Sequence, residues 1–148
     1  MQQDAPAAVT RSSLLALAAH RTPRFYGVIL SRTLSGNVRQ WIGSALGGEP
    51  DERVRRQEFD ERGPIPAGEL RRRLDETMEA ARRTIDALDP ATLLERRRVQ
   101  GFEETKLAIL VHVLEHFSYH AGQIAQRTKE LGDLDLGFYA GQDLDRRG

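Results

Sequence analysis

The longest helical pattern in the chain reads EETKLAILVHVLEHFSYHAGQIAQRTKEL and runs from Glu103 to Leu131. Its apolar residues recur at intervals of three and four, which is the period of one face of an α-helix. Gly132 follows directly, and glycine commonly ends helices because it tolerates a left-handed backbone. We therefore expect one helix over this whole segment.

Three of the four histidines of the chain lie in this segment, at His112, His116 and His120. Neighbours spaced by four residues share one helical face and lie about 6 Å apart along the axis, so two of them can bind one metal ion. All three cannot, because the outer pair is about 12 Å apart. On a helical wheel His116 and His120 fall on the apolar arc, whereas His112 falls toward the polar side, pointing outward or lying beside the ligands. Gln123 shares the side of His116 and can orient a ligand.

An inward histidine pair also has an ordinary structural explanation, because buried histidines are often hydrogen-bonded core residues without a metal. Both interpretations stay open for His116 and His120 from spacing alone.

Two other segments have helical periodicity. The first runs from Phe25 to Leu46 and is followed by the helix-ending run GGEP at 47–50. The second runs from Ala67 to Leu88, and its apolar stripe comprises Leu70, Leu74, Met78, Ala81, Ile85 and Leu88. A weaker helical pattern lies at Arg11–His20.

The connection Asp51–Pro66 is long, charged and rich in helix breakers. A long connection of this kind either carries function or joins two helices as a crossover in a bundle. No segment shows a convincing alternation of strand type. We therefore expect an all-α fold, most simply a four-helix bundle, as one domain over residues 1–148.

Composition narrows the function classes. The 148 residues contain 22 Lys and Arg against 22 Asp and Glu, and this balance argues against a nucleic-acid-binding protein. The arginine runs at 71–73 and 96–98 have acidic neighbours, which favours solvated surface. The absence of cysteine excludes disulfides, thiolate metal sites and a cysteine nucleophile. No segment reaches the roughly 18 apolar residues of a membrane span, so we expect no membrane partner and a cytoplasmic location.

Residues 102–124 are similar to the last helix of the DinB/YfiT-like family, and GNVRQWI at 36–42 resembles the second helix of that family. The runs RVRRQEF at 53–59 and LGFY at 136–139 fit the same branch of bacterial proteins. The resemblance covers most of the chain, from Leu34 to Tyr139. It implies a four-helix bundle of up-down-down-up order with a long crossover, and a divalent ion, nickel or zinc, held by three histidines.

Two of those three family ligands match His116 and His120. The third should precede the Gly-Asn motif, where the run in this branch resembles His-Leu-x-Gly-Asn. Here the run is TLSGN, so Thr33 stands at the third ligand position. A neutral threonine hydroxyl is a poor ligand, and the site would be weak unless water, Asn37 or His20 completes it.

The resemblance implies metal-assisted chemistry, either thiol-dependent transfer or a hydrolase-like reaction, on an unknown small-molecule or thiol substrate. Asn37, Gln123 and His112 would then support the ligands, and two copies of the chain would pair as a homodimer. The alternative is a non-catalytic helical-bundle dimer or interaction protein with a degenerate metal site. Residues 1–33 depart from the family pattern, and residues 133–148 read as a tail.

Overall fold

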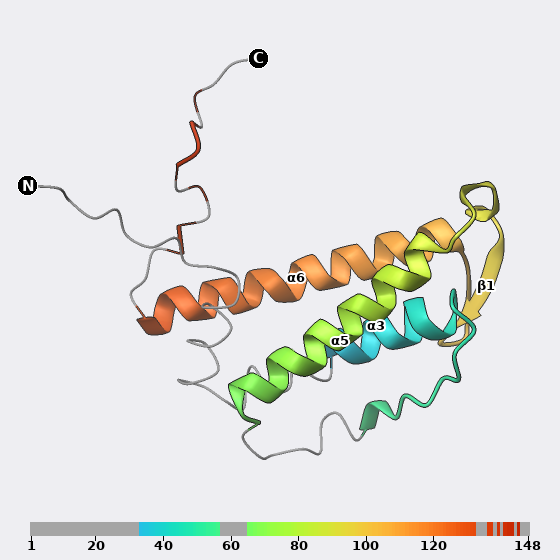
Figure 1. Cartoon of the computed structure of the whole chain (residues 1–148), viewed down its shortest axis with the longest axis horizontal. Coiled ribbons are helices and arrows are strands. Elements are labelled where there is room, and N and C mark those ends of the chain that lie inside the picture. The colour runs from blue at the N-terminus through green and yellow to red at the C-terminus, as the bar shows by residue number, and fades with distance from the viewer. Residues whose placement is uncertain are drawn as a thin grey trace, which may run out of the picture.

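The computed structural model describes residues 33–56, 65–132, 136–137, 139, 141–143 and 145. Its elements, in chain order, are the helix α3 (Ser35–Val38), the π-helical stretch η2 (Arg39–Ser44), the helix α5 (Ala67–Asp86), the 3-10 turn η3 (Pro90–Thr92), the strands β1 (Arg96–Val99) and β2 (Phe102–Thr105), and the helix α6 (Lys106–Gly132). Figure 1 shows the axes of α3, α5 and α6 roughly parallel, with the strands at one end; α3 and α5 run toward that end, and α6 runs back from it.

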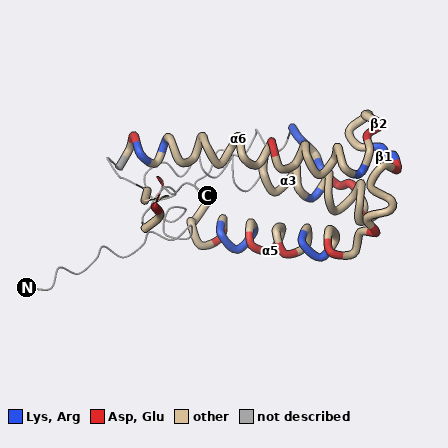
Figure 2. Tube along the Cα trace, turned by 90° about the horizontal axis from the view of Figure 1, so that it is seen from above, with Lys and Arg blue, Asp and Glu red and all other residues tan. Residues whose placement is uncertain are grey.

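The helical segment α3–η2 contacts both α5 and α6 and lies between them in the view of Figure 2. The four consecutive residues from Gln40 to Gly43 are all buried, which is expected of a helix that is covered on more than one side. The core forms around this segment. It comprises Val38, Trp41 and Ile42 of α3–η2, Ala81 of α5, Val99 of β1 and Ile109 of α6.

The helix predicted over Ala67–Leu88 is confirmed as α5, which ends two residues earlier, at Asp86. Its predicted stripe is buried at Leu70, Leu74 and Ala81. Met78 and Ile85, in contrast, are exposed. Figure 2 shows basic and acidic residues alternating along α5, and several of them form exposed ion pairs that each contribute little to stability.

The expectation of an all-α four-helix bundle is wrong for the part of the chain that the structure describes. That part contains three helical segments longer than one turn, α3–η2, α5 and α6, and a two-stranded antiparallel sheet. The long helix was expected from Glu103, but Phe102–Thr105 forms strand β2 and α6 begins at Lys106. The weak pattern at Arg11–His20 and the start of the segment from Phe25 lie outside the described residues.

The hairpin has a physical cause that hydrophobic periodicity does not reveal. Gln100 and Gly101 both have positive φ angles, 51° and 85°, and such two-residue loops match the twist of an antiparallel pair. The register then places residues of opposite charge across from each other, with Arg97 opposite Glu104. Val99 is buried, but the other strand positions are exposed or partly buried, so the alternation of apolar residues is missing.

The start of α6 is tied to the segment before the hairpin. The backbone N–H of Lys106 donates to the carbonyl of Glu95 at 2.9 Å, and Thr105 Oγ1 accepts from the N–H of Ala108 at 3.1 Å. The buried Lys106 ammonium also binds Glu95 at 3.0 Å and Thr92 at 2.8 Å. These bonds satisfy free N–H groups of the first helical turn and position the histidines further along the helix.

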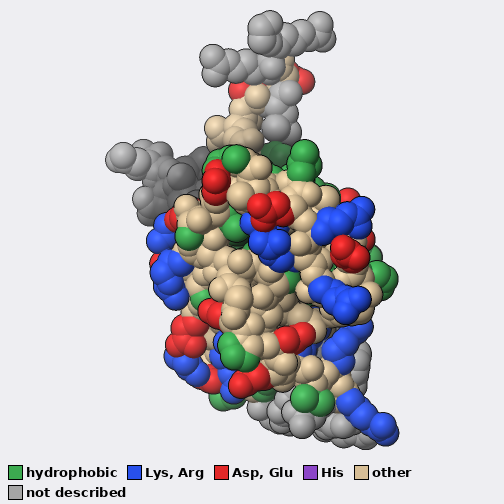
Figure 3. All heavy atoms as spheres, turned by 90° about the vertical axis from the view of Figure 1, so that its right-hand side faces the viewer, with side chains coloured by type: hydrophobic (Ala, Val, Ile, Leu, Met, Phe, Trp, Pro, Cys, Tyr) green, Lys and Arg blue, Asp and Glu red, His purple; other side chains and the backbone are tan. Residues whose placement is uncertain are grey.

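Basic and acidic side chains are interspersed over the end of the molecule that carries the hairpin (Figure 3). Arg97 is paired there with Glu95 at 3.0 Å. Within the described ranges, no helix is long and apolar enough to cross a bilayer.

Candidate metal centre

Helix α6 carries His112, His116 and His120 at intervals of one turn. The ring centroids of His116 and His120 lie 4.6 Å apart, with the planes at 72°. Those of His112 and His116 lie 6.0 Å apart, with the planes at 27°. All three side chains are partly buried, and the closest pair is the one that the wheel selects.

His120 is oriented by the next turn of its own helix. Its Nδ1 lies 2.8 Å from Gln123 Oε1, and Gln123 Nε2 donates to the Tyr119 hydroxyl at 3.1 Å. Because the amide oxygen can only accept, Nδ1 is the donor of this bond, and in the neutral ring the lone pair is on Nε2. Gln123 thus orients the His120 ring, as a hydrogen-bonding neighbour commonly does for a metal-binding histidine.

His116 is neutral at ordinary pH. Burial lowers its pKa to about 4, and electrostatic repulsion from His120, His112, Arg53 and Arg55 acts in the same direction. A neutral imidazole is the form that binds a metal ion.

His112 lies against α3–η2 rather than in solvent. Its ring stacks on Trp41 with centroids 3.8 Å apart, and its Nε2 lies 3.4 Å from Asn37 Nδ2. The helical wheel allowed His112 either to point outward or to lie beside the ligands. Its contacts with Trp41 and Asn37 hold the ring against the neighbouring helix. Sequence reasoning missed this stack, because it depends on how α3–η2 packs on α6.

Asn37 and Trp41 are buried, with 4% and 5% of their surface exposed. Asn37 Oδ1 and Trp41 Nε1 are buried without a hydrogen-bond partner among the residues that the structure describes. One acceptor and one donor are therefore available beside His112. Thr33 lies one helical turn before Asn37 and is partly buried.

The structure brings together two of the expected ligands, with Gln123 behind one of them. Among the described residues there is no group of three or more His, Asp or Glu side chains arranged to hold a metal ion. His20, the other imidazole considered for the third position, lies outside the described residues. The donor set therefore fits a weakly held cation and does not fit a three-histidine site.

A family model, that of the DinB family, matches residues 38–147 of the chain. The matched region covers most of the sequence and contains all three histidines of α6, whereas Thr33 and Asn37 precede it. The searches of curated proteins and of solved structures returned no match.

Proposed function

The chain belongs to the DinB family, and from this premise we propose that it binds a divalent metal ion, nickel or zinc, through His116 and His120. The observation that carries the proposal is the separation of 4.6 Å between the two ring centroids. Two nitrogens that bind one ion at about 2.1 Å lie no more than about 4 Å apart, so both rings can reach the same ion.

The protonation of the pair supports the same function. His116 is neutral because burial holds its pKa at about 4. His120 directs its Nδ1 proton to Gln123 and leaves Nε2 for a ligand. The His116 ring therefore does not have to lose a proton before it binds a cation at pH 7.

The third donor is a neutral oxygen. Asn37 Oδ1 is buried and has no hydrogen-bond partner among the described residues, and Thr33 precedes it by one turn. An amide or hydroxyl oxygen is a weaker donor than imidazole for nickel or zinc. We expect an affinity well below that of a three-histidine site.

A divalent ion held by two histidines keeps open positions, and it supplies a Lewis acid that polarises an oxygen or lowers the pKa of a bound water or thiol. The reaction class that fits is transfer to a thiol or hydrolysis, on a small substrate. In this arrangement His116 and His120 would bind the metal ion, and Gln123 would orient the ring of His120.

Metal titration followed by calorimetry tests the proposal, with zinc and nickel as probes. His116→Ala and His120→Ala should each abolish binding. His112→Ala is the matched control on the same helix and should keep it. Thr33→His should tighten binding by about tenfold or more, since it supplies an imidazole at the third position.

Two results would contradict the proposal. One is a His116→Ala variant that binds zinc as tightly as the wild type. The other is a His112→Ala variant that loses as much affinity as His116→Ala, because the pair would then not be the site.

A second candidate is a non-catalytic interaction protein whose metal site has decayed. The observation in its favour is Thr33 at the third ligand position, with no complete ligand group among the described residues. It predicts no binding of zinc or nickel to the wild type and binding to Thr33→His.

A further inference from the structure

A polar pocket of about 720 Å³, separate from the histidines, lies between α3–η2, the middle of α5 and the segment 49–54. This volume is within the range of small-molecule sites. None of the candidate metal ligands lines the pocket. On the two helices the lining carries Arg39, Arg73 and the acidic Glu76, and on the segment it carries Glu49, Asp51, Glu52 and the basic Arg53.

Arg39 is held in place on the helical side of the pocket by a buried hydroxyl. Its Nε donates to Thr77 Oγ1 at 3.3 Å, and that hydroxyl donates to the carbonyl of Arg73 at 2.8 Å. Only 2% of Thr77 is exposed, so the hydroxyl is a rigid support. Arg39 forms no ion pair with any carboxylate of the described residues, and its two terminal nitrogens remain for a ligand.

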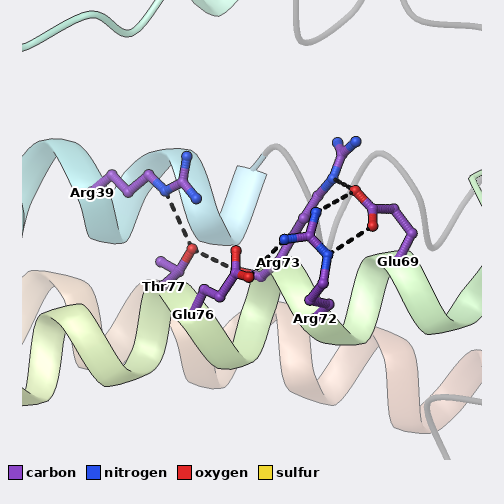
Figure 4. Close-up of polar contacts among 6 residues, drawn as sticks. All are labelled: Arg39, Glu69, Arg72, Arg73, Glu76 and Thr77. Atoms are coloured by element: carbon purple, nitrogen blue, oxygen red, sulfur yellow. Dashed lines mark hydrogen bonds and ion pairs between the residues drawn. The ribbon is translucent and has the colours of Figure 1, made fainter.

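Arg73 is the second guanidinium on this side (Figure 4). Its Nε is bonded to Glu69 Oε1 at 2.6 Å, which fixes the side chain and leaves its terminal nitrogens. Glu76 also lines the pocket, but Arg72 binds it at 2.6 Å and balances its charge. Guanidinium groups held in this way suit a carboxylate, since they donate in parallel pairs.

The segment 49–54 carries three carboxylates against one guanidinium, that of Arg53, which donates to Gln40 Oε1 at 3.0 Å. Asp51 anchors the segment, because its Oδ2 accepts from Gln40 Nε2 at 2.7 Å. The N–H of Glu49 donates to the carbonyl of Gly43 at 3.1 Å, which sets the start of the segment. Glu49 and Glu52 form no ion pair with another described residue, so their carboxylates are available to a cation.

We propose that this pocket binds a small zwitterion with a carboxylate at one end and an ammonium group at the other, namely a free amino acid or a short peptide. The carboxylate binds Arg39 and Arg73, and the ammonium binds Glu49 and Glu52. A plain anion would meet the acidic segment, and a plain cation would meet the two guanidinium groups. A ligand with both charges satisfies the two sides together.

Three matched probes test the charge requirement at pH 7, where an α-amino group is mostly protonated. Glycylglycine carries both charges, N-acetylglycine only the carboxylate, and glycinamide only the ammonium. Amide chemical shifts in NMR spectra report binding. Glycylglycine should give saturable shifts at the pocket, and each of the other probes should bind about tenfold more weakly or worse.

Variants assign the binding to the pocket. Arg39→Gln and Glu52→Gln should each weaken glycylglycine binding by about tenfold. Arg71→Gln is the control, because Arg71 lies on α5 outside the pocket and pairs with Asp75 at 3.5 Å. Glu52 is exposed and its side chain makes no hydrogen bond to a described residue, so its variant should fold even if Arg39→Gln does not.

The proposal is overturned if the wild type gives no saturable shifts with glycylglycine up to the solubility of the probe. It is also overturned if N-acetylglycine or glycinamide binds as tightly as glycylglycine, or if Arg71→Gln loses as much affinity as Glu52→Gln. Loss of zinc binding in the histidine variants has no bearing on these outcomes, since the pocket and the histidines share no side chain.

Discussion

Replacing Gly47 by alanine should destabilise the fold, because the added Cβ has no room. It would lie 2.6 Å from the carbonyl oxygen of Gly43 and 3.2 Å from Cγ2 and Oγ1 of Thr84 on α5. The first neighbour is backbone and cannot turn away. The end of η2 must therefore shift against α5, and the carbonyl of Gly43 also accepts the N–H of Glu49.

Forcing an extra methyl group into a packed site costs about 1 to 3 kcal/mol. For a chain of this size each kcal/mol lowers the melting temperature by about 2 to 4 °C, so Gly47→Ala should melt about 2 to 12 °C below the wild type. Differential scanning calorimetry measures this shift directly.

Gly43→Ala is the matched control, four residues earlier on the same helical segment. Its Cβ would lie 2.7 Å from Oε2 of Glu49, which is the far end of a flexible side chain and can move aside. Alanine also favours a helix over glycine by about 1 kcal/mol, so this variant should melt at or above the wild-type temperature. The reasoning fails if Gly47→Ala is as stable as the wild type, or if Gly43→Ala loses as much stability as Gly47→Ala.

Three further predictions concern α6. In metal-free protein the free energy of unfolding should fall by about 1 to 3 kcal/mol as the pH drops from 6.5 to about 4. Burial holds the pKa of His116 at about 4 in the folded protein, so the unfolded chain takes up the proton first. Denaturation at several pH values measures this fall, and His116→Asn should flatten the dependence of the unfolding free energy on pH. Lys106→Met should cost about 1 to 3 kcal/mol, since it removes buried charge-assisted bonds to Glu95 and Thr92. The same variant should raise the pKa of Glu95 toward its ordinary value, as carboxyl NMR signals would report, because bonding to Lys106 lowers it. Gly122→Ala should raise the unfolding free energy by up to about 1 kcal/mol, because its Cβ meets nothing within 4 Å; an unchanged or lower denaturation midpoint would contradict this.

Sequence periodicity predicted the elements whose apolar residues face a neighbour. Helix α5 lies within two residues of its expected bounds, because Leu70 and Leu74 are buried at helical spacing. The hairpin was not predicted, because its strands carry charged residues such as Arg97 and Glu104 in place of apolar alternation, and because Gln100 supplies a positive φ that its residue type rarely adopts.

Only the part of the candidate site that lies on a single helix could be predicted from the sequence. The proximity of His116 and His120 follows from their spacing on α6. Two other features depend on how separate helices pack: the contact of His112 with Trp41, and the pocket that Arg39 and Thr77 line. No short-range sequence pattern predicts this packing.

The π-helical stretch η2 directly continues the helix α3. A π turn holds one residue more than the α-helical turn that would span the same length. Deleting a single residue within Arg39–Ser44 would therefore turn this stretch into a regular α-helical turn, and the residues on either side would keep their faces of the helix. Asn37 would stay on the side of His112, and Thr33 would stay one turn before it. The π turn thus absorbs one inserted amino acid and leaves the amino-terminal half of this helix aligned with the three histidines of α6.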